Sequence, residues 1–218
     1  GNSCELAHFL QTMREVVDAE ATAYAKELGI NRPIKTTTIA PTGTIAKLPG
    51  VTEGIHPIYA RHFVQRIRYA ETDSSLQVEI DKGRHVEDCI YTAGTAVVSV
   101  PTRNAILDKF DQELIEDVSE IHIDDLFRVQ AFFQQHWADN AVSFTANIDP
   151  DTKAEELSSV LGKWLEHLKG TTVFPDLSRP QSPYERIDAT TFEELTAGSA
   201  VETGQDFDEC ANGACPVR

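Results

Sequence analysis

Three short stretches rich in β-branched residues are spaced along this chain, and they constrain its fold more than any other feature. They cover residues 36–40, 95–101 and 141–148, and prolines 41 and 101 are expected to end the first two. Short stretches rich in β-branched residues are typical of buried strands. A fourth segment, residues 58–67, is expected to be a strand or a short helix.

Amphipathic stretches separate these runs. Residues 5–28 repeat apolar side chains at helical spacing, Ser3 can cap the start of this helix and Gly29 can end it. Its expected core stripe is Leu6, Phe9, Leu10, Met13, Val16, Val17, Tyr24 and Leu28. Further helices are expected at residues 74–82, 112–137 and 155–168. Strands that alternate with helices predict an α/β fold with parallel strands joined by right-handed crossovers.

The first run stops at a small, hydroxyl-rich loop. Pro41, Thr42, Gly43 and Thr44 can turn the chain so that successive backbone N–H groups and two hydroxyls converge on an anion. No basic residue lies within the loop, so such a site would depend on dipoles and hydrogen bonds. An ordinary strand-to-loop turn is an equally good explanation of the pattern alone.

Composition limits the classes of protein to be considered. A chain of 218 residues with 41% apolar content can bury one sizeable core. Its net charge of −16 argues against general binding to duplex DNA, which requires a basic face. Without a membrane-spanning run or a leader, we expect an intracellular, cytoplasmic protein that binds no membrane. The first residue is Gly1 and not Met, which suggests a fragment, a processed product or one piece of a larger enzyme.

The end of the chain differs in composition from the rest. Residues 185–209 hold eight acidic residues against one basic residue, Arg186, so this segment is expected to be a mobile, poorly packed tail. Cys210 and Cys215 follow it and bracket four small or polar residues. They can form a disulfide, they can be inert thiols, or they can contribute two of the four ligands that structural zinc needs. Four cysteines in all are too few for a disulfide framework and favour a reducing compartment.

Several segments, in this order, resemble the large subunit of ribonucleotide reductases. The loop at residues 41–45 is similar to the phosphate-binding loop of that family, and EGIHP at 53–57 is similar to the cobalamin-dependent, class II branch. The other matching segments are QHWADNAVSFT at 135–145, LKGTT at 168–172, QSPYE at 181–185 and CANGACPVR at 210–218. Ordered matches over nearly the whole chain are far more specific than any one of them.

This resemblance implies a fold and a domain division. The family's catalytic domain is a ten-stranded α/β barrel made of two half-barrels. Residues 1–184 would form its C-terminal part, and residues 185–218 would form a flexible acidic tail.

The resemblance also implies roles for individual residues. Thr42, Gly43, Thr44 and Ile45 would bind the phosphate of a ribonucleotide substrate. Cys210 and Cys215 would be the redox shuttle that reduces the active-site disulfide and is itself reduced by thioredoxin or a similar dithiol. Cys4 does not match the family's radical cysteine, because Ser3 replaces a proline and Glu5 is one residue too close. We therefore expect Cys4 to belong to a helix start, and Cys89 to pack as a small apolar side chain.

The segment around Phe144 distinguishes between radical sources. Reductases that import a radical use adjacent tyrosines on the corresponding strand, whereas this strand has none. The resemblance therefore implies adenosylcobalamin as cofactor, which generates the radical locally. The spacing of His56, His62 and His85 does not predict a metal site, and no histidine-ligated cobalamin motif is present. Arg61, Arg66 and Arg68 are the best candidates for positive charge near a triphosphate, although for any one of them a solvated face with carboxylate partners is the better explanation.

The sequence thus predicts the C-terminal part of a cobalamin-dependent ribonucleotide reductase that acts on triphosphates or diphosphates. Alone it would be inactive, because the N-terminal portion carries the radical cysteine. Two other classes remain: a nucleotide-binding regulatory module of a reductase, and a small thiol oxidoreductase. The terminal cysteine pair argues against the first, and its position outside a strand–helix junction argues against the second.

Overall fold

The computed structural model describes residues 3–43, 45–47, 49–176, 179–197 and 202–203. These residues form two compact units that interleave along the chain. Unit 1 consists of residues 1–41, 54–56 and 121–174, and unit 2 consists of residues 42–53, 57–120 and 175–218.

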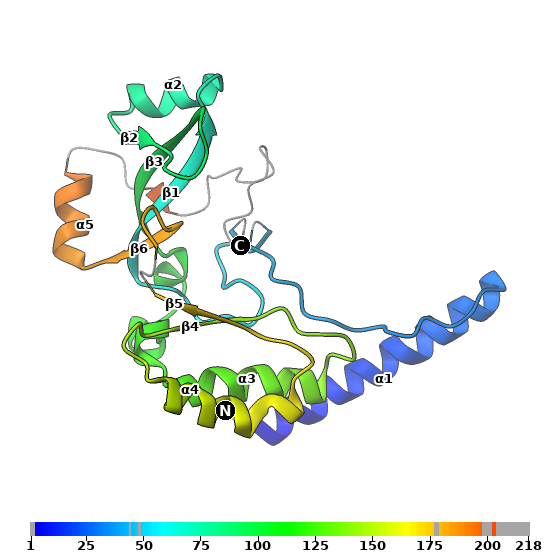
Figure 1. The fold of residues 1–218 in the computed structure, drawn as a ribbon. Helices are drawn as coiled ribbons and strands as arrows, with labels where there is room; N and C mark the ends of the chain where they lie inside the picture. The colour runs from blue at the N-terminus through cyan, green and yellow to red at the C-terminus, as the bar shows by residue number, and fades with distance from the viewer. Residues whose placement is uncertain (1–2, 44, 48, 177–178, 198–201, 204–218) are drawn as a thin grey trace. The chain divides into compact units, whose positions relative to one another are not determined.

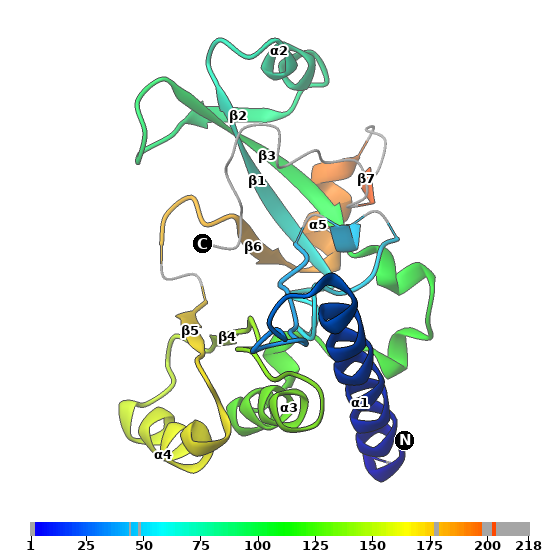
Figure 2. The same ribbon diagram turned by 90° about the vertical axis from the view of Figure 1, so that its right-hand side faces the viewer.

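Unit 1 is mainly helical. Its elements are α1 (Ser3–Leu28), α3 (Ile123–His136), β4 (Thr145–Ile148), α4 (Ala154–Trp164) with the 3-10 turn η5 (Leu165–His167), and β5 (Thr172–Pro175). Helix α3 contacts both α1 and α4, and β4 pairs with β5 (Figure 2). The most completely buried apolar side chains of this unit are Phe127 on α3 and Ala146 on β4, both fully shielded from solvent.

Residues 36–40 lie beside residues 140–143 but form less of a strand than expected. Ile39 makes a single parallel bridge with Val142, and only Thr37 is buried. The backbone N–H groups of Asn140 and Ser143 donate to Thr37 and Ile39, over N···O distances of 3.0 Å each. The third expected strand likewise shortens to β4, which begins at Thr145.

Unit 2 is built on an antiparallel sheet. The strands are β1 (His62–Ala70), β2 (His85–Asp88), β3 (Thr95–Arg103) and β6 (Tyr184–Ile187), in the order β2-β3-β1-β6, and β7 (Glu202–Thr203) pairs with β3 in parallel. Helix α2 (Ser74–Asp81) inserts Leu76 against Ala96, Val98 and Val100 of β3, while α5 (Ala189–Thr196) contacts β1 and β3. Short 3-10 turns complete the unit: η1 (Ile45–Lys47), η2 (Ala105–Asp108), η3 (Gln112–Leu114) and η4 (Val118–Glu120).

The α/β class is confirmed, but two details of the strands were predicted wrongly. Parallel strands were expected throughout, whereas β1, β2, β3 and β6 pair antiparallel. Pro101 was expected to end its strand, yet β3 continues to Arg103. The alternation of the ladder directs the missing N–H of Pro101 toward the β2 side, where β2 has already ended at His85 opposite Ser99. The proline therefore removes no ladder hydrogen bond.

The helix expected at residues 112–137 is also shorter than predicted. Residues 112–120 contain only η3 and η4, and α3 begins at Ile123. The side chain of Asp111 caps η3, and that of His122 caps α3 by accepting from the N–H of Asp124. These caps divide the segment. Val129 is 38% exposed, and the buried positions of α3 are Ile123, Leu126, Phe127, Gln130, Ala131 and Gln134.

The first part of the segment that was expected to be a mobile tail contains regular structure. Residues 184–187 form β6, and α5 follows with Phe192 buried against the ring of His62. One aromatic side chain thus anchors a segment that is otherwise acidic. Residues 204–218, with Cys210 and Cys215, lie outside the described part of the chain.

Helix α1 matches its predicted limits, but its stripe does not form a core. Gly29 ends the helix with φ 67°, as expected. Most of the predicted core side chains are exposed, including Phe9 and Val16 at 58% each. Within the described residues, no helix is both long enough and apolar enough to span a membrane.

Candidate functional site

A carboxylate fixes the start of the extended segment that leads to the hydroxyl-rich loop. Asp139 accepts hydrogen bonds from the backbone N–H groups of Thr36 and Thr37, at N···O distances of 3.1 and 3.0 Å. The hydroxyl of Thr37 donates to the carbonyl of Trp137 at 2.7 Å. The indole of Trp137 in turn donates to the carbonyl of Thr38 at 3.0 Å. The extended segment is therefore held in register from its first residue.

Hydrogen bonds around Asp139 join three segments that were identified from the sequence. Lys169 donates to the carbonyl of Asp139 at 2.5 Å. The fully buried side chain of Gln130 donates to the carbonyl of Gly170 at 2.7 Å and accepts from the hydroxyl of Thr171 at 2.9 Å. Residues 36–40, 137–140 and 169–171 thus form one hydrogen-bonded frame in unit 1.

The environment of Asp139 favours its ionised form. Burial opposes ionisation, but the N–H groups of Thr37 and Thr36, the hydroxyl of Thr37 and the charge of Lys35 outweigh it. Together they hold the pKa of Asp139 below its ordinary value.

We expect Asp139→Asn to lower the free energy of unfolding by about 1–3 kcal/mol at pH 7, because hydrogen bonds to a charged acceptor are lost. Since the folded pKa is depressed, this contribution is complete above the unfolded pKa of about 3.9 and disappears as the pH falls through the folded value. Denaturant unfolding from pH 3 to pH 7 should show the difference between wild type and variant shrinking below about pH 4. Asp151→Asn, which removes an exposed carboxylate of unit 1, should have little effect; an equal loss from both variants would contradict this role.

The loop itself has an unusual backbone. Thr42 has φ 53°, a left-handed conformation that a β-branched residue rarely adopts. The N–H of Ala46 donates to the carbonyl of Thr42 at 2.9 Å, and the N–H of Val51 donates to the carbonyl of Ala46 at 3.1 Å. Among the predicted phosphate ligands, Gly43 lies in the turn, Ile45 begins η1 and is 70% exposed, and Thr44 lies outside the described residues. Such strain is concentrated at functional sites.

Ala40 and Gly54, which lie on either side of this loop in the sequence, contact each other. Gly54 has φ 55°, and a Cβ atom placed on it would lie 2.8 Å from the carbonyl oxygen of Ala40. Only a glycine fits so close to that backbone. The segment from Thr42 to Glu53 is therefore a loop with closed ends, which is typical of compact functional loops.

His56 fixes the chain as it leaves this contact. Its ring stacks on Phe144, with centroids 4.8 Å apart and planes inclined by 15°. Its Nε2 accepts a hydrogen bond from the backbone N–H of Thr145 at 2.9 Å, so a neutral ring carries its proton on Nδ1. The sequence identified Gly54 and His56 only as parts of a family motif. Their structural roles depend on contacts with residues distant in the chain.

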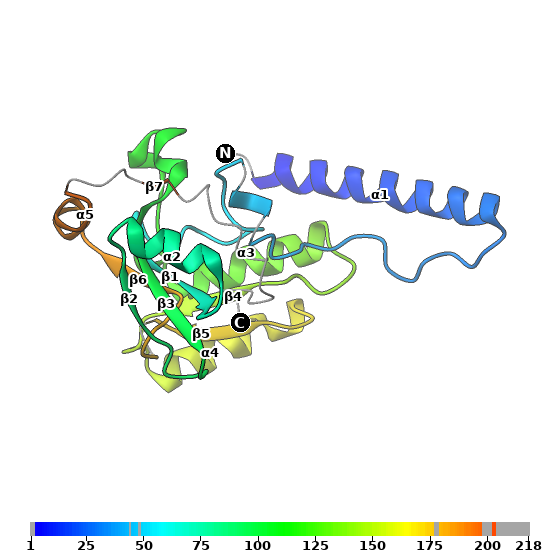
Figure 3. The same ribbon diagram turned by 90° about the horizontal axis from the view of Figure 1, so that it is seen from above.

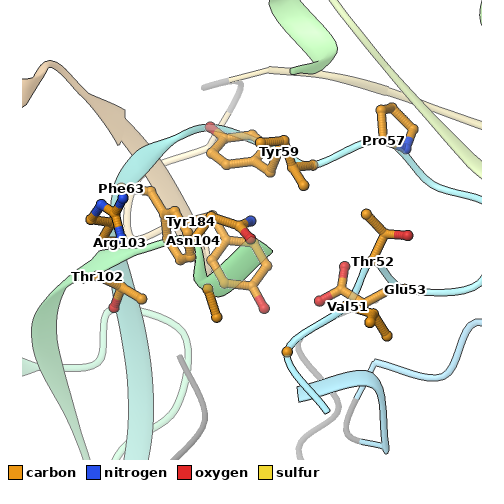
Figure 4. Close-up of a pocket in the computed structure, with 13 residues that line it drawn as sticks. Val51, Thr52, Glu53, Pro57, Tyr59, Phe63, Thr102, Arg103, Asn104 and Tyr184 are labelled. Carbon is orange, nitrogen blue, oxygen red and sulfur yellow. The ribbon is translucent and has the colours of Figure 1, made fainter. Parts of the chain in front are cut away.

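An open pocket lies in unit 2 (Figure 4). Tyr59, Phe63 and Tyr184 form its aromatic wall, and residues 50–53 of the loop border it. The rings of Phe63 and Tyr184 meet edge to face at 5.2 Å. The hydroxyl of Tyr59 donates to Asp176 at 2.7 Å, and burial, together with this carboxylate, raises the pKa of Tyr59 above its ordinary value. No sequence pattern indicated this pocket, because its lining residues come from segments 50–63 and 102–105 and from Tyr184.

The three candidate arginines bind protein groups. Arg61 donates to Glu120 at 2.7 Å and to the carbonyl of Ile115 at 2.5 Å. Arg66 pairs with Glu185, and Arg68 donates to the carbonyl of Gln181 at 2.9 Å. The alternative explanation, that such arginines have carboxylate partners, is therefore correct for Arg61 and Arg66.

The described cysteines have no common site. Cys4 lies exposed in the first turn of α1, as expected, and Cys89 is buried. Burial alone would raise the pKa of Cys89, but backbone N–H groups and Arg68 lower it overall. Among the residues that the structure describes, no group of three or more His, Cys, Asp or Glu side chains is placed to hold a metal ion.

Comparison with known proteins gives consistent matches. The family model for the barrel domain of ribonucleotide reductase matches residues 20–174. A relative from Mycobacterium phage D29, described as an adenosylcobalamin-dependent ribonucleoside-triphosphate reductase, is 42% identical over 96% of this chain and 32% of its own length. A protein with the same description from Lactobacillus acidophilus is 37% identical over 90% of this chain and 28% of its own length.

A crystal structure of a B12-dependent, class II ribonucleotide reductase has a similar fold. The TM-score is 0.69 at 32% sequence identity, over 88% of this chain and 26% of that chain. This chain therefore spans about a third, or less, of the length of each of these proteins.

Proposed function

This chain belongs to the ribonucleotide reductase family through its barrel domain, and on that premise we propose that it is the C-terminal part of an adenosylcobalamin-dependent ribonucleoside-triphosphate reductase. The descriptions of its relatives support the cofactor and the triphosphate substrate. The complete enzyme would convert ribonucleotides to deoxyribonucleotides by thiyl-radical chemistry. The portion outside this chain would supply the radical cysteine.

The role of this chain in substrate binding rests on one observation, the strained loop with closed ends. We assign the substrate phosphate to Thr42, Gly43, Thr44 and Ile45. The left-handed φ of Thr42 and the closure at Gly54 hold the loop in one conformation before substrate binds. A preformed set of backbone N–H groups binds an anion without the cost of ordering the loop at that moment.

The residues around Phe144 fit the proposed cofactor. Phe144 is 4% exposed and stacked on His56, and no tyrosine lies between Val142 and Ile148 to relay a radical. Adenosylcobalamin, when bound, supplies a radical locally, so no relay is needed. The part of this chain would be to position the substrate.

We assign thiol–disulfide exchange to Cys210 and Cys215. One tail thiolate attacks a sulfur of the active-site disulfide and forms a mixed disulfide. The second tail thiolate then attacks the tail sulfur of this mixed disulfide, which breaks its bond to the active-site cysteine. The active-site pair gains two electrons and two protons, and the tail pair is left as a disulfide. Thioredoxin or a similar dithiol would reduce it again, which requires a reducing compartment such as the cytoplasm.

We expect the isolated chain to form no deoxyribonucleotide. Activity should appear when it is combined with the remaining portion of the enzyme, adenosylcobalamin, a ribonucleoside triphosphate and a dithiol. Chromatographic detection of the deoxyribonucleotide gives the readout, and omission of each component in turn is the control. Product formed by this chain alone would contradict the proposal. Nucleotide binding without product in the complete mixture would favour a regulatory module.

A further inference from the structure

The segment that follows α1 brings two carboxylates of unit 1 together. After α1 the chain reverses direction and returns toward α3 (Figures 1 and 3), and we call residues 29–36 the returning segment. The hydroxyl of Thr36, at its end, lies 3.5 Å from an oxygen of Asp18 on α1 and 3.4 Å from an oxygen of Asp139. Helix α1, the returning segment and the residues after α3 therefore meet at Thr36.

Both carboxylates already have partners within the protein. Asp18 forms an ion pair with Arg32. Asp139 accepts hydrogen bonds from the backbone N–H groups of Thr36 and Thr37. Neither carboxylate is therefore left to neutralise a further cation nearby.

Three more cations lie at the same place. Lys169 donates to the carbonyl of Asp139 at 2.5 Å, and Lys35 of the returning segment lies at hydrogen-bond distance from Lys169. Arg14 lies one turn before Asp18 on the same face of α1, and its charge also acts on Lys169. We call Arg14, Lys35 and Lys169 the basic cluster. Among the ion pairs of the described residues, none involves a member of this cluster.

The members of the basic cluster repel one another. The contact with Lys35, burial and the charge of Arg14 lower the pKa of Lys169, although Asp139 acts in the opposite direction. An anion between these groups would replace the repulsion with attraction. Together with Arg32, the cluster exceeds the two carboxylates by two positive charges, although the whole chain carries −16. A phosphate monoester carries about −1.5 to −2 at pH 7, which matches this local excess.

We propose that the basic cluster is a second anion site of this chain and binds a phosphate or polyphosphate group. The three donors come from α1, the returning segment and the segment before β5, so they can reach different oxygens of a tetrahedral phosphate. Lysine binds phosphate as a point charge, and the arginine fork can donate two parallel hydrogen bonds. The cluster shares no residue with the loop at 42–45, and the proposal does not depend on the function assigned to that loop.

The test measures binding of tripolyphosphate to the 218-residue chain by isothermal titration calorimetry, in a phosphate-free buffer of low ionic strength. Lys35→Gln should weaken binding by about tenfold or more, because one charged hydrogen-bond donor is lost. Lys26→Gln is the matched control, since it removes the same charge from an exposed lysine in the last turn of α1. It should change the affinity by less than about twofold, because exposed charges at a distance are screened. Tripolyphosphate should also raise the unfolding temperature of wild type and Lys26→Gln more than that of Lys35→Gln.

Further titrations identify the ligand and separate the two anion sites. Equal affinity for tripolyphosphate and a ribonucleoside triphosphate would support a site that binds phosphates alone, and tighter binding of the nucleotide would support one that also contacts the nucleoside. Absence of wild-type binding at millimolar tripolyphosphate, or equal affinities of Lys35→Gln and Lys26→Gln, would overturn the proposal. Binding that is lost in Gly54→Ala but kept in Lys35→Gln would also overturn it, while supporting the loop as the phosphate site. Tighter binding of a polyglutamate peptide than of tripolyphosphate would overturn it in favour of an acidic protein segment.

Discussion

Replacement of both Cys210 and Cys215 with serine is expected to abolish repeated turnover driven by thioredoxin in the assembled enzyme, while one reduction per active site remains. The prereduced enzyme already holds the two electrons for its first product, so the tail is needed only afterwards. A tethered dithiol has an effective concentration of about millimolar at its target, which a large external reductant cannot match in a closed site. We therefore expect the steady-state rate to fall at least 100-fold and the size of the single-turnover burst to stay constant.

Two controls separate a shuttle from a structural role. Dithiothreitol is small enough to diffuse into the site and should restore much of the lost turnover. Cys4→Ser changes an exposed cysteine of α1 and should leave both the burst and the steady state unchanged. Normal cycling of the double variant with thioredoxin would show that the tail is not the shuttle. Loss of the first turnover would show that these cysteines act directly in the chemistry.

Local sequence signals were sufficient for most of the helices. The limits of α1, α2 and α4 follow from helical periodicity together with a residue such as Gly29 that ends the pattern. The same reasoning failed at residues 112–120, because the helical spacing of apolar residues continued across two 3-10 turns. Asp111 and His122, which cap separate turns there, were the available signals.

Pairing between strands could not be derived in the same way. Periodicity marks a strand but does not identify its neighbour, so the antiparallel sheet of unit 2 was mistaken for a parallel one. Burial of the α1 side chains was also overestimated. The periodic pattern marks an apolar face of the helix, but it does not show what packs against that face.

The residues that shape the loop illustrate the same limit. The Pro-Thr-Gly-Thr sequence predicted a turn, and family resemblance suggested its ligand. The positive φ of Thr42 and the approach of Gly54 to Ala40 are products of tertiary contacts. No sequence pattern distinguishes a glycine that is required by such an approach from one that merely ends a helix.

We expect Gly54→Ala to disrupt the loop and to weaken ribonucleotide binding by the assembled enzyme at least tenfold. The new Cβ would lie 2.8 Å from the carbonyl oxygen of Ala40, a backbone atom that cannot rotate away, and φ 55° adds its own strain. Separation of the two ends would release the left-handed conformation at Thr42. Overpacking of this kind costs about 1–3 kcal/mol, which corresponds to roughly a fivefold to 150-fold loss if it falls on the binding conformation.

Gly29→Ala provides the matched control, because it separates backbone strain from the close contact. Gly29 also belongs to unit 1 and has φ 67°, but a Cβ there would meet nothing within 4 Å. Both variants should lose about 1 kcal/mol of folding free energy to the left-handed backbone. Only Gly54→Ala should show the further loss in denaturant unfolding and the weaker nucleotide binding in equilibrium titration. If the two variants behave alike, the contact between Gly54 and Ala40 does not hold the loop in its binding conformation.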